Sequence, residues 1–118
     1  MDKLDKIFEK QMELQKKYFY DKIKTQADKQ SYVNQQLLSL YEETTEVMRC
    51  TSYKNPEMVK FGWKKNQKND FEHMKEELVD VFHFVTNLSL IIGMNADEFF
   101  EIYAKKNKVN DDRQKEGY

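Results

Sequence analysis

Residues that break helices are scarce in this sequence. Three glycines and one proline occur in 118 residues, whereas Lys, Glu, Gln, Leu and Met, which favour helices, are abundant. The chain has the length of one domain with one modest core, so we predict a single all-α domain spanning residues 1–118. The single cysteine, Cys50, excludes an internal disulfide and a cysteine-rich metal site.

An excess of one charge sign is also missing. Charged residues make up 35% of the chain, but the formal net charge is only -1. No global field therefore favours nucleic acid or an anionic membrane, and we expect neither as a partner. The sequence also lacks a signal peptide and an apolar run long enough to span a bilayer. These features predict a soluble, cytoplasmic protein.

Helical periodicity predicts four helices separated by polar segments. We expect them near residues 2–24, 31–52, 69–92 and 96–106. Ser31 is a candidate N-cap for the second helix, and Asn95 with Glu98 forms a capping-box pattern before the fourth. The tail over residues 107–118 is polar, so we expect it to be irregular and to act as a mobile lid.

The third predicted helix is apolar around its whole circumference from Leu78 onward. Such a helix must be covered on more than one side, and four helices of this size hardly surround one of their own. A second subunit would complete the cover, so we predict a homodimer.

The connection before this helix, "YKNPEMVKFGWKKNQK", is sixteen residues long and carries one large ring, Trp63. Pro56 and Gly62 break helical structure in it. Because such connections are usually shorter, we expect it to contain a turn of helix or to have a function.

Two pairs of carboxylates occur at helical spacing. Glu43 and Glu46 are three residues apart in the second predicted helix, and Glu77 and Asp80 have the same spacing in the third. Each pair therefore projects from one face of its helix, and packing of the two helices would gather all four carboxylates. Oxygen ligands at such a seam suit a hard cation, and Mg²⁺ is the natural occupant.

The alternative for any single pair is solvated surface charge, because the chain has 21 acidic residues. Asp80 argues against this alternative. It lies between Val79 and Val81, and no Lys or Arg occurs between it and Ala104. A carboxylate in apolar surroundings without a cationic neighbour is costly, so metal binding explains it best.

These carboxylate pairs, with "ELVDVFHFV" and the tail "YAKKNKVNDDRQKEGY", resemble the all-α nucleoside triphosphate pyrophosphohydrolases of the MazG-like superfamily. The chain is most similar to the dimeric dUTPase branch, including its phage members, and the resemblance extends over residues 4–118. It implies a four-helix-bundle-like homodimer that uses Mg²⁺ to hydrolyse dUTP to dUMP, with dUDP as an additional candidate substrate.

The resemblance also implies roles for individual residues. It makes Glu43 and Glu46 catalytic, with Glu43 orienting the attacking water. The implied metal ligands are Glu43, Glu46, Glu77 and Asp80. Trp63 and His83 match positions that border the base, and the tail matches a phosphate-contacting segment. The implied substrate contacts are Gln11, Trp63, His83, Lys106, Asn110, Arg113 and Tyr118.

Other roles for the base contacts stay open. Trp63 has an alternative role in packing its loop onto the helices, and His83 has one as a hydrogen-bonded core residue. Gln11 lies within the apolar stripe of the first predicted helix, as does Gln15, where the family carries asparagine. These two amides either read the base or pair with backbone or with each other.

The substrate is open as well. A pyrophosphohydrolase of the same fold that acts on dCTP or on a modified nucleotide is one alternative, and a non-catalytic helical interaction module is another. The chain also has only about ten residues between Gly93 and the tail, where many dimeric dUTPases carry extra helices. We therefore expect a pocket that is more open or is completed by the partner subunit.

Overall fold

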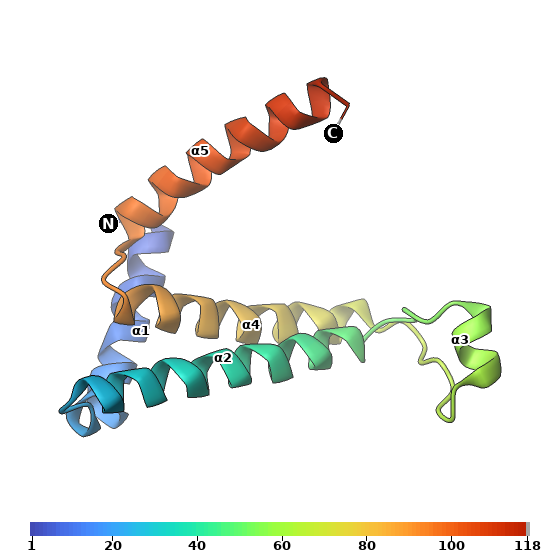
Figure 1. Cartoon of the computed structure of the whole chain (residues 1–118), viewed down its shortest axis with the longest axis horizontal. Coiled ribbons are helices and arrows are strands. Elements are labelled where there is room, and N and C mark those ends of the chain that lie inside the picture. The colour runs from blue at the N-terminus through green and yellow to red at the C-terminus, as the bar shows by residue number, and fades with distance from the viewer. Residues whose placement is uncertain (118) are drawn as a thin grey trace. The chain divides into compact units, whose positions relative to one another are not determined.

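Helices form all the regular structure in residues 1–117, the part of the chain that the computed structural model describes. Tyr118, a candidate substrate contact, lies outside the described residues. In chain order the elements are α1 (Lys3–Tyr18), the 3₁₀ helix η1 (Tyr20–Lys22), α2 (Gln26–Met48), α3 (Pro56–Phe61), α4 (Phe71–Ile91) and α5 (Ala96–Lys115) (Figure 1). The all-α prediction is confirmed.

The start of α2 differs from the prediction. Thr25 is the N-cap: its hydroxyl accepts a hydrogen bond from the Asp28 backbone N–H at 3.0 Å, and the Asp28 carboxylate accepts one from the Thr25 N–H at 3.1 Å. This reciprocal capping box begins the helix before Ser31, so the prediction of Ser31 as N-cap was wrong. At α5, the predicted cap is correct, because the Asn95 side chain accepts from the Glu98 N–H at 2.9 Å.

The C-terminal segment is helical rather than irregular. The prediction of a fourth helix ending near residue 106 was wrong, since α5 continues to Lys115. No glycine or proline interrupts the chain from Ala96 to Glu116, and Asp111 pairs with Lys115 at 3.0 Å one turn later. Gly117, at a φ of 79°, follows the helix where a left-handed residue commonly ends one.

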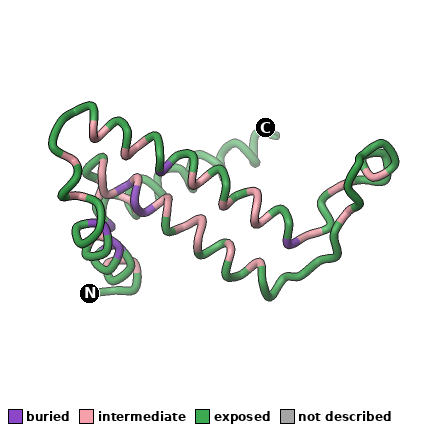
Figure 2. The backbone as a smooth tube through the Cα atoms, turned by 90° about the horizontal axis from the view of Figure 1, so that it is seen from below, coloured by how far each residue is buried: buried purple, intermediate pink, exposed green. Residues whose placement is uncertain are grey.

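The chain forms two compact units. Lys24–Val85 form the first, which we call the helix-pair unit, and Met1–Ile23 with the chain from Thr86 onward form the second, which we call the terminal unit. In the helix-pair unit, α2 and residues 71–85 of α4 lie side by side and run in opposite directions (Figures 1 and 2). Side chains at facing positions of the two helices can therefore meet.

Hydrogen bonds fix the connector, residues 51–70, that joins this helix pair. The Asn69 side-chain oxygen accepts from the Thr51 hydroxyl at 2.8 Å and from the Ser52 N–H at 2.7 Å. Asn66 donates to the Ser52 hydroxyl at 2.7 Å and to the Lys54 carbonyl at 2.8 Å. The connector contains α3, which confirms the expected turn of helix.

The terminal unit contains most of the buried residues, which Figure 2 colours purple. The rings of Phe8 and Phe99 meet edge to face, with centroids 5.6 Å apart. Polar residues dominate the rest of its buried set, which includes Gln11, Gln15, Thr86, Asn87 and Ser89. Buried amides and hydroxyls are stable only when they are hydrogen-bonded, so this unit depends on polar pairing as well as on apolar packing.

Apolar side chains on the helix-pair unit stay exposed in the single chain. Leu78 and Val79 on α4 are more than half exposed, and so are Leu38 and Tyr41 on α2. Among the described residues, no single helix is long and apolar enough to cross a membrane, and α4 and α5 meet that test only as a bent pair.

Candidate metal centre

Three carboxylates meet between α2 and α4. Glu43 comes from α2, and Glu77 and Asp80 come from adjacent turns of α4. One oxygen of each lies within 4.8 Å of the others, and all three side chains are partly buried. The spacing of three residues places Glu77 and Asp80 on one face of α4. Because α2 lies beside α4, Glu43 reaches these two side chains from the facing side of α2.

The electrostatics of this carboxylate group are unfavourable without a cation. Burial raises the pKa of the Glu43 carboxyl, and the neighbouring charges of Asp80 and Glu77, then Glu46 and Glu42, raise it further. A divalent cation would remove this repulsion. An all-oxygen donor set fits Mg²⁺ better than a softer transition metal, so the residues present fit the implied ion.

Glu46 lies outside the three-carboxylate group. Its Oε1 accepts a hydrogen bond from the Arg49 guanidinium at 2.7 Å, and both side chains are about half exposed. Sequence reasoning did not single out Arg49, although its position three residues after Glu46 on the same helix is a signal for such a pair.

Two histidines contact the carboxylates of α4. His73 Nε2 lies 3.2 Å from Glu77 Oε1, and the Glu77 side chain is only 14% exposed. His83 Nδ1 lies 3.8 Å from Asp80 Oδ1 and is about half exposed, which is inconsistent with a buried core role for His83. Sequence reasoning missed His73, although its spacing of four residues from Glu77 was visible. Both histidines thus lie beside carboxylates of the candidate metal centre.

Trp63 follows Gly62 in the connector and is 94% exposed. It therefore does not pack the connector onto the helices. A fully exposed indole offers an apolar face to a ligand, and a nucleotide base is a suitable partner for such a face.

The other predicted substrate contacts belong to the terminal unit. Gln11 Nε2 donates to Asn87 Oδ1 at 2.8 Å, and their residues are 8% and 3% exposed. Gln11 thus pairs with a side chain of α4. Helical periodicity places the exposed residues Lys106, Asn110 and Arg113 along one face of α5.

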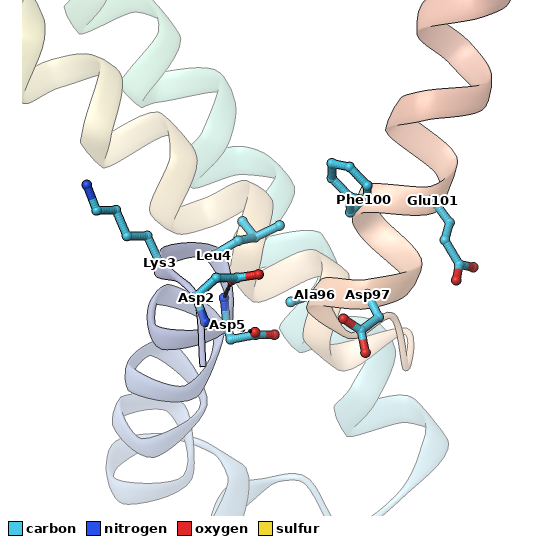
Figure 3. A pocket seen from close by; sticks show the side chains of 8 residues that line it. All are labelled: Asp2, Lys3, Leu4, Asp5, Ala96, Asp97, Phe100 and Glu101. Atoms are coloured by element: carbon cyan, nitrogen blue, oxygen red, sulfur yellow. Dashed lines mark hydrogen bonds between the residues drawn. The ribbon is translucent and has the colours of Figure 1, made fainter.

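A groove of about 620 Å³ lies where the first turns of α1 and α5 meet (Figure 3). Its apolar lining comes from Leu4, Ala96 and Phe100. The charged residues around it are Asp2, Lys3, Asp5, Asp97 and Glu101. None of the predicted site residues that the structure describes lines it, and its excess of carboxylates does not suit an anionic substrate.

A sequence model of a protein family described as dUTPase matches residues 3–98. The chain belongs to the dUTPase family. The matched region contains the four carboxylates predicted as metal ligands, together with Gln11, Trp63 and His83. The α5 positions from Lys106 onward lie beyond the family match, so their phosphate-contacting role has no support from it.

Similarity to individual proteins is strong but short. The chain is 56% identical over 45 residues to a dCTP pyrophosphatase of Enterobacteria phage T4, and 47% identical over 45 residues to one of Enterobacteria phage LZ5. Each alignment covers 38% of this chain and 26% of the relative. A further match, to a DNA replication protein of phage T4, is 57% identical over 35 residues, which are 30% of this chain and 9% of that protein. No solved structure matches the chain significantly.

Proposed function

We propose that this chain is a Mg²⁺-dependent nucleoside triphosphate pyrophosphohydrolase that converts dUTP to dUMP and pyrophosphate, and that also accepts dUDP. One observation carries the proposal: the group formed by Glu43, Glu77 and Asp80 lies inside the region that matches the dUTPase family. The resemblance of the two carboxylate pairs to the pyrophosphohydrolases gives the same reaction.

The chain's own residues have defined tasks in this proposal. Glu43, Glu77 and Asp80 hold Mg²⁺, and Glu46 joins them. A divalent ion held by these residues would supply positive charge to the phosphate oxygens and would lower the pKa of water. Glu43 also orients the attacking water in this proposal, a role that the resemblance to the pyrophosphohydrolases implies and that its place among the three carboxylates supports. His73 holds Glu77 in position through their 3.2 Å contact.

Base recognition is assigned to Gln11, Trp63 and His83. The Gln11 side chain donates to Asn87 through its amide nitrogen. This bond does not use the Gln11 side-chain oxygen, which can accept a hydrogen bond from a donor on the base. Uracil offers N3–H and cytosine offers its 4-amino group, and an acceptor suits either one. The phage relatives described as dCTP pyrophosphatases favour dCTP as the second candidate substrate.

The quaternary state and the tail complete the proposal. The exposed Leu38, Tyr41, Leu78 and Val79 support a homodimer, since apolar surface of this kind is usually covered in the functional assembly. Lys106, Asn110 and Arg113 share one face of α5 and are assigned to the phosphates, together with Tyr118. We propose that the tail, residues 107–118, serves as a lid over the substrate, with its residues up to Lys115 in helix α5 rather than in the irregular segment that the sequence predicted.

A substrate panel tests the activity. Purified protein is incubated with Mg²⁺ and with dUTP, dUDP, dCTP or dTTP, and the products are separated by anion-exchange chromatography. We expect dUMP and pyrophosphate from dUTP, and no product when a chelator replaces Mg²⁺. A clear preference for dCTP would reassign the base. An absence of turnover with every nucleotide would refute the enzyme and favour the interaction module.

A further inference from the structure

A second, smaller pocket lies in the helix-pair unit, where α2 runs into the connector. Its volume is about 230 Å³. Its lining consists of Arg49, Tyr53, Lys54, Lys64, Lys65 and Gln67. Among these described lining residues four are cationic and none is acidic, whereas four carboxylates and one lysine surround the groove near the N-terminus.

The connector holds these cations in place through its own hydrogen bonds. Lys54 Nζ donates to the Lys64 carbonyl at 2.9 Å, and Asn66 donates to the Lys54 carbonyl at 2.8 Å. The Lys54 N–H in turn donates to Asn66 Oδ1 at 3.3 Å. These bonds link the backbone near Lys54 to the backbone near Lys64 and Asn66. The backbone that carries Lys64 and Lys65 is therefore held in a fixed position.

The positive charge of this pocket is not balanced within the connector. The connector contains five lysines and only two acidic residues, Glu57 and Asp70. None of the ion pairs within residues 1–117 includes Lys54, Lys64 or Lys65. Like charges gathered in one concave place repel each other, and an anion with several oxygens would relieve that repulsion.

We propose that this pocket, which we call the connector pocket, binds a phosphate anion of the pyrophosphate type. Lysine ammonium groups and an arginine guanidinium are the usual partners of phosphate oxygens. The source of the anion, either the phosphate chain of the bound nucleotide or the released pyrophosphate, follows from the proposed function and rests on it.

Arg49 links the connector pocket to the candidate metal centre. One N–H of its guanidinium is used by Glu46, and a guanidinium carries five N–H donors, so others are left for a phosphate oxygen. An anion in the pocket would thus share Arg49 with Glu46. Through Arg49, the proposed anion would be one residue away from Glu46, the carboxylate nearest in sequence to Glu43 on the same face of α2.

Calorimetric titration of pyrophosphate into the full chain, in chelator and without divalent metal, tests the pocket. Without metal the carboxylates repel the anion, so binding reports the cationic side chains. We expect saturable binding that is weakened about tenfold or more in the Lys64→Gln/Lys65→Gln variant, since two charge-assisted contacts are lost. The Lys60→Gln/Lys68→Gln variant removes the same charge from the same connector at positions that do not line the pocket. We expect it to bind within about threefold of the original chain.

Two outcomes would overturn the connector pocket: no binding of pyrophosphate to the unchanged chain, or equal weakening in both double variants. A titration with a non-hydrolysable α,β-imido dUTP distinguishes the sources. If the Lys64→Gln/Lys65→Gln variant loses more affinity for the analogue than for pyrophosphate, the pocket belongs to the nucleotide, and a larger loss for pyrophosphate assigns it to the product. Because these titrations need no turnover, a failed substrate panel would refute the enzyme and leave the pocket standing.

Discussion

The carboxylates of the helix-pair unit and the amides of the terminal unit are both polar groups drawn together by α4, but they differ in what they do for the fold. Glu43, Glu77 and Asp80 are like charges at short range and are only partly buried. Gln11 and Asn87 are neutral, buried and joined at 2.8 Å. Without a bound cation, the repulsion among the three carboxylates opposes folding. The hydrogen bond between Gln11 and Asn87 stabilises the fold directly. Substitutions should therefore separate activity from stability.

The largest effect is expected at Glu77. Glu77→Gln removes one charged ligand from the carboxylate group and should lower kcat by about a hundredfold or more, because the metal-dependent step loses part of its charge stabilisation. The same change relieves repulsion, so the metal-free protein should unfold at the same or a higher temperature. Steady-state kinetics with Mg²⁺ and thermal melts in chelator measure the two effects.

Glu76→Gln is the matched control for this variant. Glu76 is the preceding residue on α4, its side chain is 81% exposed, and it lies outside the carboxylate group. It should retain near-normal turnover. If Glu77→Gln also keeps near-normal turnover, the three carboxylates do not form the metal centre.

A smaller effect, on stability, is expected at Asn87. Asn87→Ala leaves the buried Gln11 amide without its acceptor, which should lower the free energy of unfolding by about 1–3 kcal/mol. Asn34→Ala is the control, because Asn34 accepts a similar bond from Gln30 at 2.9 Å on the exposed side of α2. The control should stay within about 0.5 kcal/mol in urea unfolding. Equal losses in the two variants would contradict the contrast between buried and exposed amides.

The smallest effect is expected from Glu43→Gln in the metal-free protein. The folded-state pKa of Glu43 is raised, so ionisation of this carboxyl costs stability as the pH rises through that pKa. The variant should therefore be more stable near neutral pH, by less than about 1 kcal/mol because the site is partly exposed. The gain should vanish at about pH 4 and below, where the carboxyl is protonated in both states. Thermal melts across this range, in chelator, measure it; a gain that persists in acid would point to packing instead.

Local spacing accounts for what the sequence predicted well. The separations of Glu77 from Asp80 and of Asn95 from Glu98 lie within one helical turn, and a turn fixes which side chains are neighbours. The same rule would have identified the contact of His73 with Glu77 and that of Arg49 with Glu46. Neither contact was predicted, because the sequence pattern had indicated a metal as the partner of Glu77 and Glu46.

Long-range pairing explains most of what was not predicted. Gln11 and Asn87 are separated by 76 residues, and only the packing of α1 against the end of α4 brings them together. The extent of α5 was underestimated for a different reason. A polar sequence without breakers carries no apolar periodicity to mark it as a helix, yet its intrinsic propensity and ion pairs sustain one.

The bonding of the connector has a consequence for how this protein can change. Asn66 and Asn69 determine the path of the backbone, while no hydrogen bond or ion pair within residues 1–117 uses the side chain of Lys64 or Lys65. The residues that fix the path of the connector backbone are thus different from the lysines that give the connector its positive charge. A variant can exchange Lys64 or Lys65 for a neutral or acidic residue and keep the same loop. The anion preference of the segment can therefore be retuned in single steps, without first redesigning the scaffold that presents it.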